Sequence, residues 1–388
     1  MKGLWRIRLF LIAASTVGIA APSGQADAPA WMHAAASAPL PSYDPKTNAV
    51  LIYSEDITTV MPDGKMKGTE RRAYKILRPD GRQYAVAQAY ISNDTRLGMM
   101  RAWCIPQSGK DYEVKDKDAV DRSAALTGED LVSDVKIRTL KIPAGEVGNV
   151  VGYEIQYDGR PYVLDDEWVF QREIPVKEAR YTLQMPAGWE YKAVWVNHGK
   201  VEPNPSGANQ WQWLITDVPE IRPERRMPPW SGLAGRMAVA FIAPGARPSK
   251  SFLTWDDMAK WQTGLAEGKR DATPEISSKV AQIASGKTTP ELKMQEIAQF
   301  IQKDIRYVAI EIGIGGWQPH SARDIYAHRY GDCKDKATLM STMLKLTGID
   351  SYYLFINTRR GVVGPDTPPE RMFDHAILAI KLPDNVKR

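Results

Sequence analysis

The chain is 388 residues long, and its shares of hydrophobic (43%) and charged (25%) residues are typical of globular domains. This composition excludes collagen-like repeats, long disordered tracts and a polytopic membrane protein, and the length allows two domains. The formal net charge is +5. Because Lys2, Arg6 and Arg8 lie in a leader that we expect to be removed, the remaining positive excess is too small and dispersed to indicate a nucleic-acid partner.

The N-terminal segment has the pattern of a secretory signal peptide. Basic residues precede an apolar stretch at 9–21, and small residues follow up to Ala28. The apolar stretch is shorter than the roughly 20 residues that a membrane-spanning helix needs. We therefore expect residues 1–28 to be a signal peptide and the mature protein, without a transmembrane span, to be periplasmic or secreted. Anchoring in the membrane through the N-terminus is the alternative.

Residues 40–218 are predicted to form a β-rich domain of unknown function. Pro-Asp-Gly triplets at 62–64 and 79–81 favour turns, and glycines punctuate the later segments. Short strands at this spacing are typical of an all-β, sandwich-like fold. Trp211 and Trp213 share one face of a strand, which suits a hydrophobic core or, alternatively, a carbohydrate or peptide platform, and we favour the core. Strands are expected over 49–60, 66–77, 135–142, 150–157, 179–185, 189–196 and 210–215.

The chain changes character after residue 218. Four prolines within 219–230 indicate an extended connector, which we assign to 219–255. Two later triplets, Thr273-Pro274-Glu275 and Thr289-Pro290-Glu291, each place a hydroxyl at a helix N-cap, proline at the first helical position and an acid in the first turn. The sequence therefore predicts two helices that begin at these triplets.

Cys333 is predicted to lie in the first turn of a buried helix. Gly331 and Asp332 break and cap the chain, and apolar residues then recur at helical spacing until Gly348. Unpaired backbone N–H groups and the positive end of the helix dipole favour a thiolate, so we expect a pKa below the ordinary value of about 8.5. The lysines at 334 and 336 are expected to add to this effect. Cys333 is therefore a candidate nucleophile.

His375 is the candidate base. It lies in an apolar segment with strand propensity at 373–380, and another predicted strand occupies 351–358. An imidazole on a strand beside the start of the cysteine helix is able to reach the thiol, and it titrates near neutral pH. The predicted order is thus helix with cysteine, strand, loop, and strand with histidine.

Several sequence motifs resemble the bacterial transglutaminase-like superfamily, whose core shares the papain-like arrangement of catalytic groups. They are Gly331-Asp332-Cys333-Lys334-Asp335-Lys336, Phe373-Asp374-His375, Gly316-Trp317-Gln318-Pro319 and the proline-rich connector with Glu224. The β-rich front half is similar to an uncharacterised β-domain that precedes such a core in bacteria. The resemblance implies an α+β chain in which an all-β sandwich-like domain is followed by a transglutaminase-like (papain-like) core at 256–388, truncated at its C-terminus.

The resemblance also implies residue roles. Cys333 would be the nucleophile, and His375 the general base that becomes a general acid when the amine leaves. The family's third catalytic residue is normally an aspartate on the next strand. We expect it beyond Arg388 and assign none here, since Asp384 looks like part of the turn that leads into that strand.

The oxyanion site implied by the resemblance combines the Cys333 backbone N–H with a second donor, for which Gln318 and Trp317 are the candidates. Packing of Trp317 beside the helix is the competing interpretation. His320 and His328 are alternate bases or metal ligands in principle, but we favour surface or hydrogen-bonded structural roles because they precede the cysteine and no acidic ligand cluster accompanies them.

The remaining motifs give little chemistry. Cys104 is expected to be a small buried hydrophobe, although a disulfide with Cys333 would mask the nucleophile. Two cysteines form no zinc site of the CxxC type, and no glycine-rich phosphate loop occurs, so neither a metal nor a cofactor is expected.

Two functions are compatible with the sequence. The first is an exported cysteine protease, amidase or acyltransferase that acts on protein or peptide amides, including cell-envelope polypeptides, through a thioester. Hydrolysis is favoured over crosslinking because amine transfer needs a dry acceptor channel. The second is a catalytically silent module that binds a cell-envelope protein or glycan. The missing acid favours the second function, and the intact cysteine and histidine oppose it.

Overall fold

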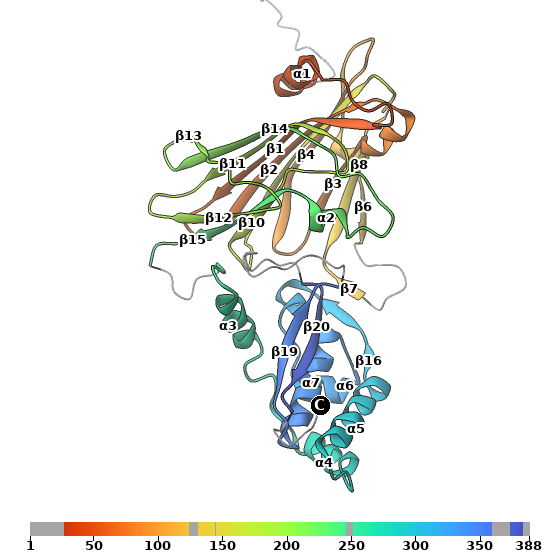
Figure 1. Cartoon of the computed structure of the whole chain (residues 1–388), viewed down its shortest axis with the longest axis vertical. Coiled ribbons are helices and arrows are strands. Elements are labelled where there is room, and N and C mark those ends of the chain that lie inside the picture. Colours follow the sequence, from red (N-terminus) through yellow and green to blue (C-terminus); the bar gives the residue numbers. More distant parts are fainter. Residues whose placement is uncertain (1–26, 124–130, 144, 246–250, 359–372, 383–388) are drawn as a thin grey trace, which may run out of the picture.

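The computed structural model describes residues 27–123, 131–143, 145–245, 251–358 and 373–382. A β-rich N-terminal region is followed by an α+β core, and the two are stacked along the long axis of the molecule (Figure 1). This arrangement confirms the expected fold class. Most of the predicted signal peptide and the segment around Asp384 lie outside the described residues.

The largest element is an 8-stranded sheet in which only the β1–β11 pair is parallel. A turn at 61–65, with Gly64 at φ +79°, joins its strands β1 and β2, as the first Pro-Asp-Gly triplet predicts. Its strands, in spatial order, are β13 (Asn204–Gly207), β14 (Gln210–Val218), β11 (Val176–Gln184), β1 (Ala49–Val60), β2 (Met66–Ile76), β9 (Val150–Gly159), β4 (Thr95–Ile105) and β5 (Tyr112–Val114).

The second Pro-Asp-Gly triplet does not form a simple turn. It begins the 3-10 helix η1 (Pro79–Tyr84), which folds back onto the start of β1. A Cβ atom on Gly81 would lie 2.2 Å from the Asn48 carbonyl oxygen, so this position requires glycine because the backbones approach closely.

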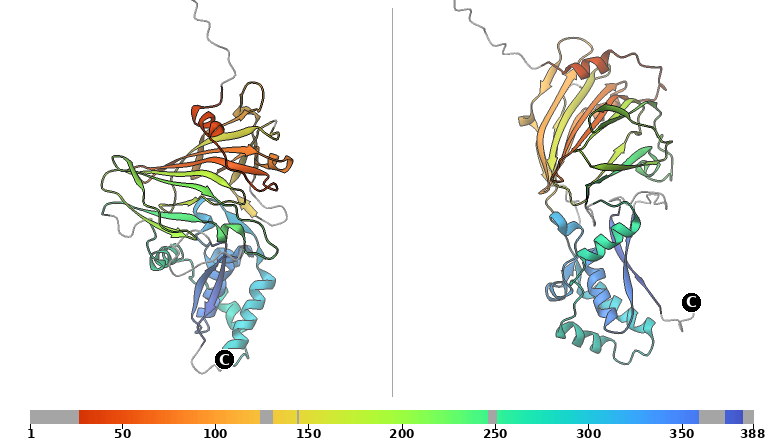
Figure 2. Two further views of the ribbon diagram at one scale, coloured as in Figure 1. Left: turned by 45° about the horizontal axis from the view of Figure 1, so that its top comes forward. Right: turned by 90° about the vertical axis from the view of Figure 1, so that its left-hand side faces the viewer.

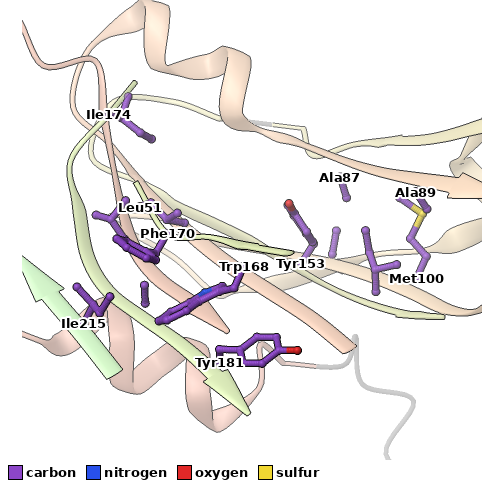
Figure 3. Close-up of a cluster of buried hydrophobic side chains, with 14 of the residues drawn as sticks. Leu51, Ala87, Ala89, Met100, Tyr153, Trp168, Phe170, Ile174, Tyr181 and Ile215 are labelled. Atoms are coloured by element: carbon purple, nitrogen blue, oxygen red, sulfur yellow. The ribbon is translucent and has the colours of Figure 1, made fainter. Parts of the chain in front are cut away.

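Two smaller sheets cover one face of the large sheet and share one hydrophobic core with it (Figures 2 and 3). In this core Trp168 stacks on Tyr181 at 5.8 Å, and Trp213 is 1% exposed, which confirms its core interpretation. The sheets consist of β10 (Asp165–Val169), β15 (Arg236–Ile242) and β12 (Glu190–Val196), and of β3 (Val86–Ile91), β8 (Lys136–Lys141) and β6 (Val120–Ser123).

Strand β15 lies within the segment that the sequence indicates as a connector. It is the middle strand of its sheet and is buried along most of its length. Buried central strands lack alternation of apolar and polar residues, so periodicity gives no signal for them. The same segment also contains the short helix α2 (Trp230–Leu233).

The opposite face of the large sheet is covered by helix α1 (Ala30–Ser37). Met32 is fully buried there, and Trp31 meets Trp103 edge-on at 6.3 Å. A Cβ on Gly152 would lie 3.0 Å from the Met32 sulfur, so glycine allows the helix and sheet to approach. The large sheet is therefore the middle layer of the β-rich region.

The C-terminal region packs four helices and a two-stranded sheet around a second core. The predicted caps are confirmed, because Thr273 and Thr289 accept hydrogen bonds from the backbone N–H groups of Ile276 and Leu292. The elements of this core are α4 (Pro274–Ile283), α5 (Pro290–Asp304), α6 (Ala322–His328), α7 (Cys333–Lys345), β19 (Ser351–Ile356) and β20 (His375–Ile380), with α3 (Trp255–Leu265) beside them.

A strand of the β-rich region pairs with a strand of the core. β7 (Leu131–Ser133) lies parallel to β17 (Ala309–Glu311) at the junction of the two regions in Figure 1. The Asp134 carboxylate accepts hydrogen bonds from the backbone N–H of Asn93, at 2.8 Å, and from that of Gly313, at 3.4 Å. Asp134 therefore links the two regions directly.

Among the described residues, no helix combines the length and apolar character needed to cross a bilayer.

Candidate active site

The start of α7 is held by reciprocal hydrogen bonds. Asp332 is the N-cap, and its carboxylate accepts the backbone N–H of Asp335 at 3.1 Å, while the Asp335 carboxylate accepts the N–H of Asp332 at 3.3 Å. This capping box satisfies two N–H groups that a helix start leaves unpaired. It fixes Cys333 as the first helical residue, as the sequence predicts.

The two residues that flank Cys333 in the chain form a buried ion pair. Lys334 is 4% exposed and Asp332 1% exposed, and the Lys334 ammonium contacts the Asp332 carboxylate. Burial raises the pKa of Asp332, and the attraction of Lys334 only partly offsets this rise. The Lys334 ammonium therefore neutralises Asp332 first and the Cys333 thiolate only in part.

The thiol environment differs from the expectation. Burial raises the pKa of Cys333, and the negative charge of Asp332 raises it further. Lys334 lowers this pKa, as do two hydrogen-bond donors that face the sulfur, the Ala376 backbone N–H and the Tyr307 hydroxyl, but burial outweighs all three. The prediction of a lowered pKa is thus wrong, because it neglected the desolvation of a sulfur that the fold half buries.

This electrostatic balance predicts the pH dependence of alkylation. Iodoacetamide reacts with thiolate, so the rate at Cys333 in the native protein should reach half its maximum at a higher pH than for a cysteine-containing peptide. Mass spectrometry of the Cys333 peptide after timed labelling measures this profile. A midpoint below that of the peptide control would contradict it.

Gly331 is required by the close approach of Asp335. A Cβ atom at position 331 would lie 2.5 Å from the Asp335 Cβ. We expect Gly331→Ala to lower the free energy of unfolding by about 1–3 kcal/mol, because overpacking must displace the capping residue. Urea denaturation followed by circular dichroism measures the change. Gly316→Ala is the matched control, because nothing lies within 4 Å of its added Cβ, and equal losses in both variants would contradict the argument.

His375 begins β20, and its backbone pairs with that of Ile356 on β19. The N–H of the following residue, Ala376, faces the Cys333 sulfur, so the strand start lies beside the thiol. The Asp374 carboxylate accepts hydrogen bonds from the backbone N–H and hydroxyl of Thr358, at 2.8 Å each. The catalytic roles of Cys333 and His375 themselves stay predictions.

The two sequence candidates for the second oxyanion donor contact other groups. The Gln318 amide donates to the Leu265 carbonyl oxygen at 3.3 Å. Trp317 meets Trp261 of α3 edge-on at 5.6 Å, and its carbonyl oxygen accepts the Gln262 amide at 2.9 Å. Both residues therefore connect the loop before α6 to α3.

The other histidines and cysteines are also placed. The His320 ring lies 3.0 Å from the Asp335 carboxylate and so contacts the capping box. The His328 ring stacks on Tyr330, with 5.8 Å between the ring centroids. Cys104 is fully buried in the β-rich core, and the structure shows no disulfide between Cys104 and Cys333. Across the part of the chain that the structure describes, no group of three or more histidine, cysteine, aspartate or glutamate side chains is arranged to hold a metal ion.

Sequence reasoning missed Tyr307. It forms β16 (Arg306–Tyr307) after α5, and its hydroxyl faces Cys333. No motif marks this tyrosine, since only the pairing of distant strands brings it to the cysteine.

Comparisons with known proteins identify both regions. Residues 277–384 match the family model of the transglutaminase-like superfamily. Residues 62–222 match a family described as "Domain of Unknown Function with solved-structure structure (DUF3857)". The chain therefore combines a domain of that family with a transglutaminase-like core, as the motifs indicate. No curated protein is significantly similar to the chain.

One solved structure shares this arrangement of the two regions. A crystal structure from Parabacteroides distasonis, described as a "putative protease", superposes with a TM-score of 0.67 at 14% identity and covers 86% of this chain. This chain spans only 65% of that protein. Yeast LTA4 hydrolase in complex with bestatin gives a TM-score of 0.26 at 7% identity over 54% of this chain and 32% of its own, a likeness too low to support an argument.

Proposed function

We propose that the protein is an exported cysteine enzyme that hydrolyses protein or peptide amides through a thioester on Cys333. One observation carries the proposal: the capped start of α7 presents Cys333 to the strand that begins with His375. The membership of the core in the transglutaminase-like superfamily supports a peptidase-like or transglutaminase-like role.

The proposed reaction begins with a neutral thiol, in keeping with the raised pKa of Cys333. His375 takes the proton from sulfur as sulfur attacks the carbonyl carbon, and the carbonyl oxygen becomes an oxyanion near the Cys333 N–H. The C–N bond then breaks, and His375 gives the proton to the leaving amine. Water adds to the thioester with His375 as base, which releases the carboxylic acid and restores the thiol.

The finer aspects of the proposal rest on the sequence. The N-terminal segment supports export to the periplasm or the exterior. Hydrolysis is favoured over amine transfer because water is abundant, whereas an amine requires a dry acceptor channel.

The test uses p-nitrophenyl acetate as an acyl donor and casein as a protein substrate. An acetylated Cys333 peptide, detected by mass spectrometry after acid quench, supports the thioester. Casein cleavage supports hydrolysis, whereas incorporation of dansylcadaverine into casein would show amine transfer instead. Failure of both Cys333 acetylation and casein turnover in the full chain would overturn the enzymatic proposal and favour the binding module.

A further inference from the structure

Tyr307 is fixed beside the catalytic turn by backbone pairing. β16 lies parallel to β18 (Tyr330–Gly331), with Tyr307 opposite Gly331, two residues before Cys333. The Arg306 N–H donates to the Arg329 carbonyl oxygen at 2.8 Å, and the Val308 N–H donates to the Gly331 carbonyl oxygen at 3.2 Å. These bonds on both sides of Tyr307 hold its backbone in register with the cysteine.

The Tyr307 side chain reaches two atoms of Cys333. Its hydroxyl donates toward the sulfur and accepts from the backbone N–H of the same residue. The residue is 44% exposed, so a substrate is able to approach it from solvent. The hydroxyl thus lies where the carbonyl oxygen of a substrate attacked by this sulfur would arrive.

The geometry leaves a place for a second oxyanion donor. The Cys333 N–H supplies the first donor, whereas the Gln318 amide bonds to Leu265 and the Trp317 ring packs on Trp261. A single backbone donor satisfies only part of the charge that develops on oxygen in acyl transfer. The Ala376 backbone N–H also faces the sulfur, and Tyr307 is a described side chain whose hydroxyl faces both the sulfur and the Cys333 N–H.

We propose that Tyr307 is a catalytic residue whose hydroxyl donates a hydrogen bond to the oxyanion formed on Cys333. This inference rests on the proposed function. When substrate binds, its carbonyl oxygen replaces the tyrosine hydroxyl as acceptor of the Cys333 N–H, and the hydroxyl turns its own proton toward that oxygen. The proton stays on tyrosine throughout, so the step stabilises charge without proton transfer.

The test is Tyr307→Phe in the full chain with p-nitrophenyl acetate. Loss of one oxyanion donor should lower kcat by about 10²–10³ and leave KM within a few-fold, because the bond strengthens in the transition state. Alkylation of Cys333 by iodoacetamide forms no oxyanion, so its plateau rate at alkaline pH should change by less than a few-fold. Tyr352→Phe, at a tyrosine 57% exposed on β19, is the matched control.

The possible outcomes separate the explanations. Unchanged kcat in Tyr307→Phe overturns the inference, as does a rise in both kcat and alkylation, which would show that tyrosine only shields the thiol. An equal loss of kcat and alkylation would indicate general disruption of the site and also overturns it. The proposed function fails separately if Cys333→Ala retains turnover. Thermal unfolding by circular dichroism checks that both variants fold.

Discussion

Replacing Cys333 by alanine is expected to lower turnover of p-nitrophenyl acetate by a factor on the order of 10⁴ or more. The reason is that no thioester forms without the sulfur, so only the acceleration that substrate binding and the oxyanion donors supply is left. Steady-state kinetics and acid-quench mass spectrometry measure the loss of turnover and of the acetylated peptide. Because alanine is a good helix former and Asp332 keeps its cap, the fold of α7 should persist.

Cys104→Ala is the matched control for this substitution. Cys104 is the second cysteine of the sequence and is fully buried in the β-rich core, away from the proposed site. Its loss should leave kcat within a few-fold and remove only a small amount of packing. Turnover retained by Cys333→Ala, or lost equally in both variants, would contradict the nucleophile assignment.

The second large effect is on stability. Lys334→Met is expected to reduce the free energy of unfolding by about 3–5 kcal/mol, because it leaves the Asp332 carboxylate buried without its cation. Both side chains are almost inaccessible to solvent, so water does not replace the lost partner. Urea denaturation at neutral pH measures the change.

The pH dependence of this variant tests the cause. Burial already holds the pKa of Asp332 above its ordinary value, so ionisation of this carboxyl costs folding free energy at neutral pH. Removing the lysine raises that pKa further, and the stability deficit relative to wild type should shrink as pH falls through it. Adding Asp332→Asn to Lys334→Met should restore much of the loss, and a deficit independent of pH and of this substitution would contradict the explanation.

Local sequence patterns predicted the helices and the position of Cys333 well. Thr273 and Thr289 cap their helices, and Asp332 caps α7, because N-cap chemistry depends on residues only three apart in the chain. The buried face of α7 followed from apolar periodicity for the same reason.

Properties that depend on distant segments were not predictable in this way. The pKa of Cys333 reflects burial by the surrounding fold, which a sequence pattern does not report. The approach of Tyr307 depends on pairing of β16 with β18, strands of two residues each that show no periodicity. Strand β15 was not predicted within the connector, because its run of buried apolar residues shows no alternation of apolar and polar residues.

The pairing of β7 with β17 has consequences for expressing the core alone and for recombination between related genes. Strand β17 of the transglutaminase-like core pairs with strand β7 of the preceding domain, and the Asp134 carboxylate accepts a hydrogen bond from the Gly313 N–H of the core. A core excised at residue 256 would therefore uncover the backbone of β17 close to Tyr307, and exposed strand edges promote self-association. Recombination between related genes should therefore exchange the β-rich domain and the core together.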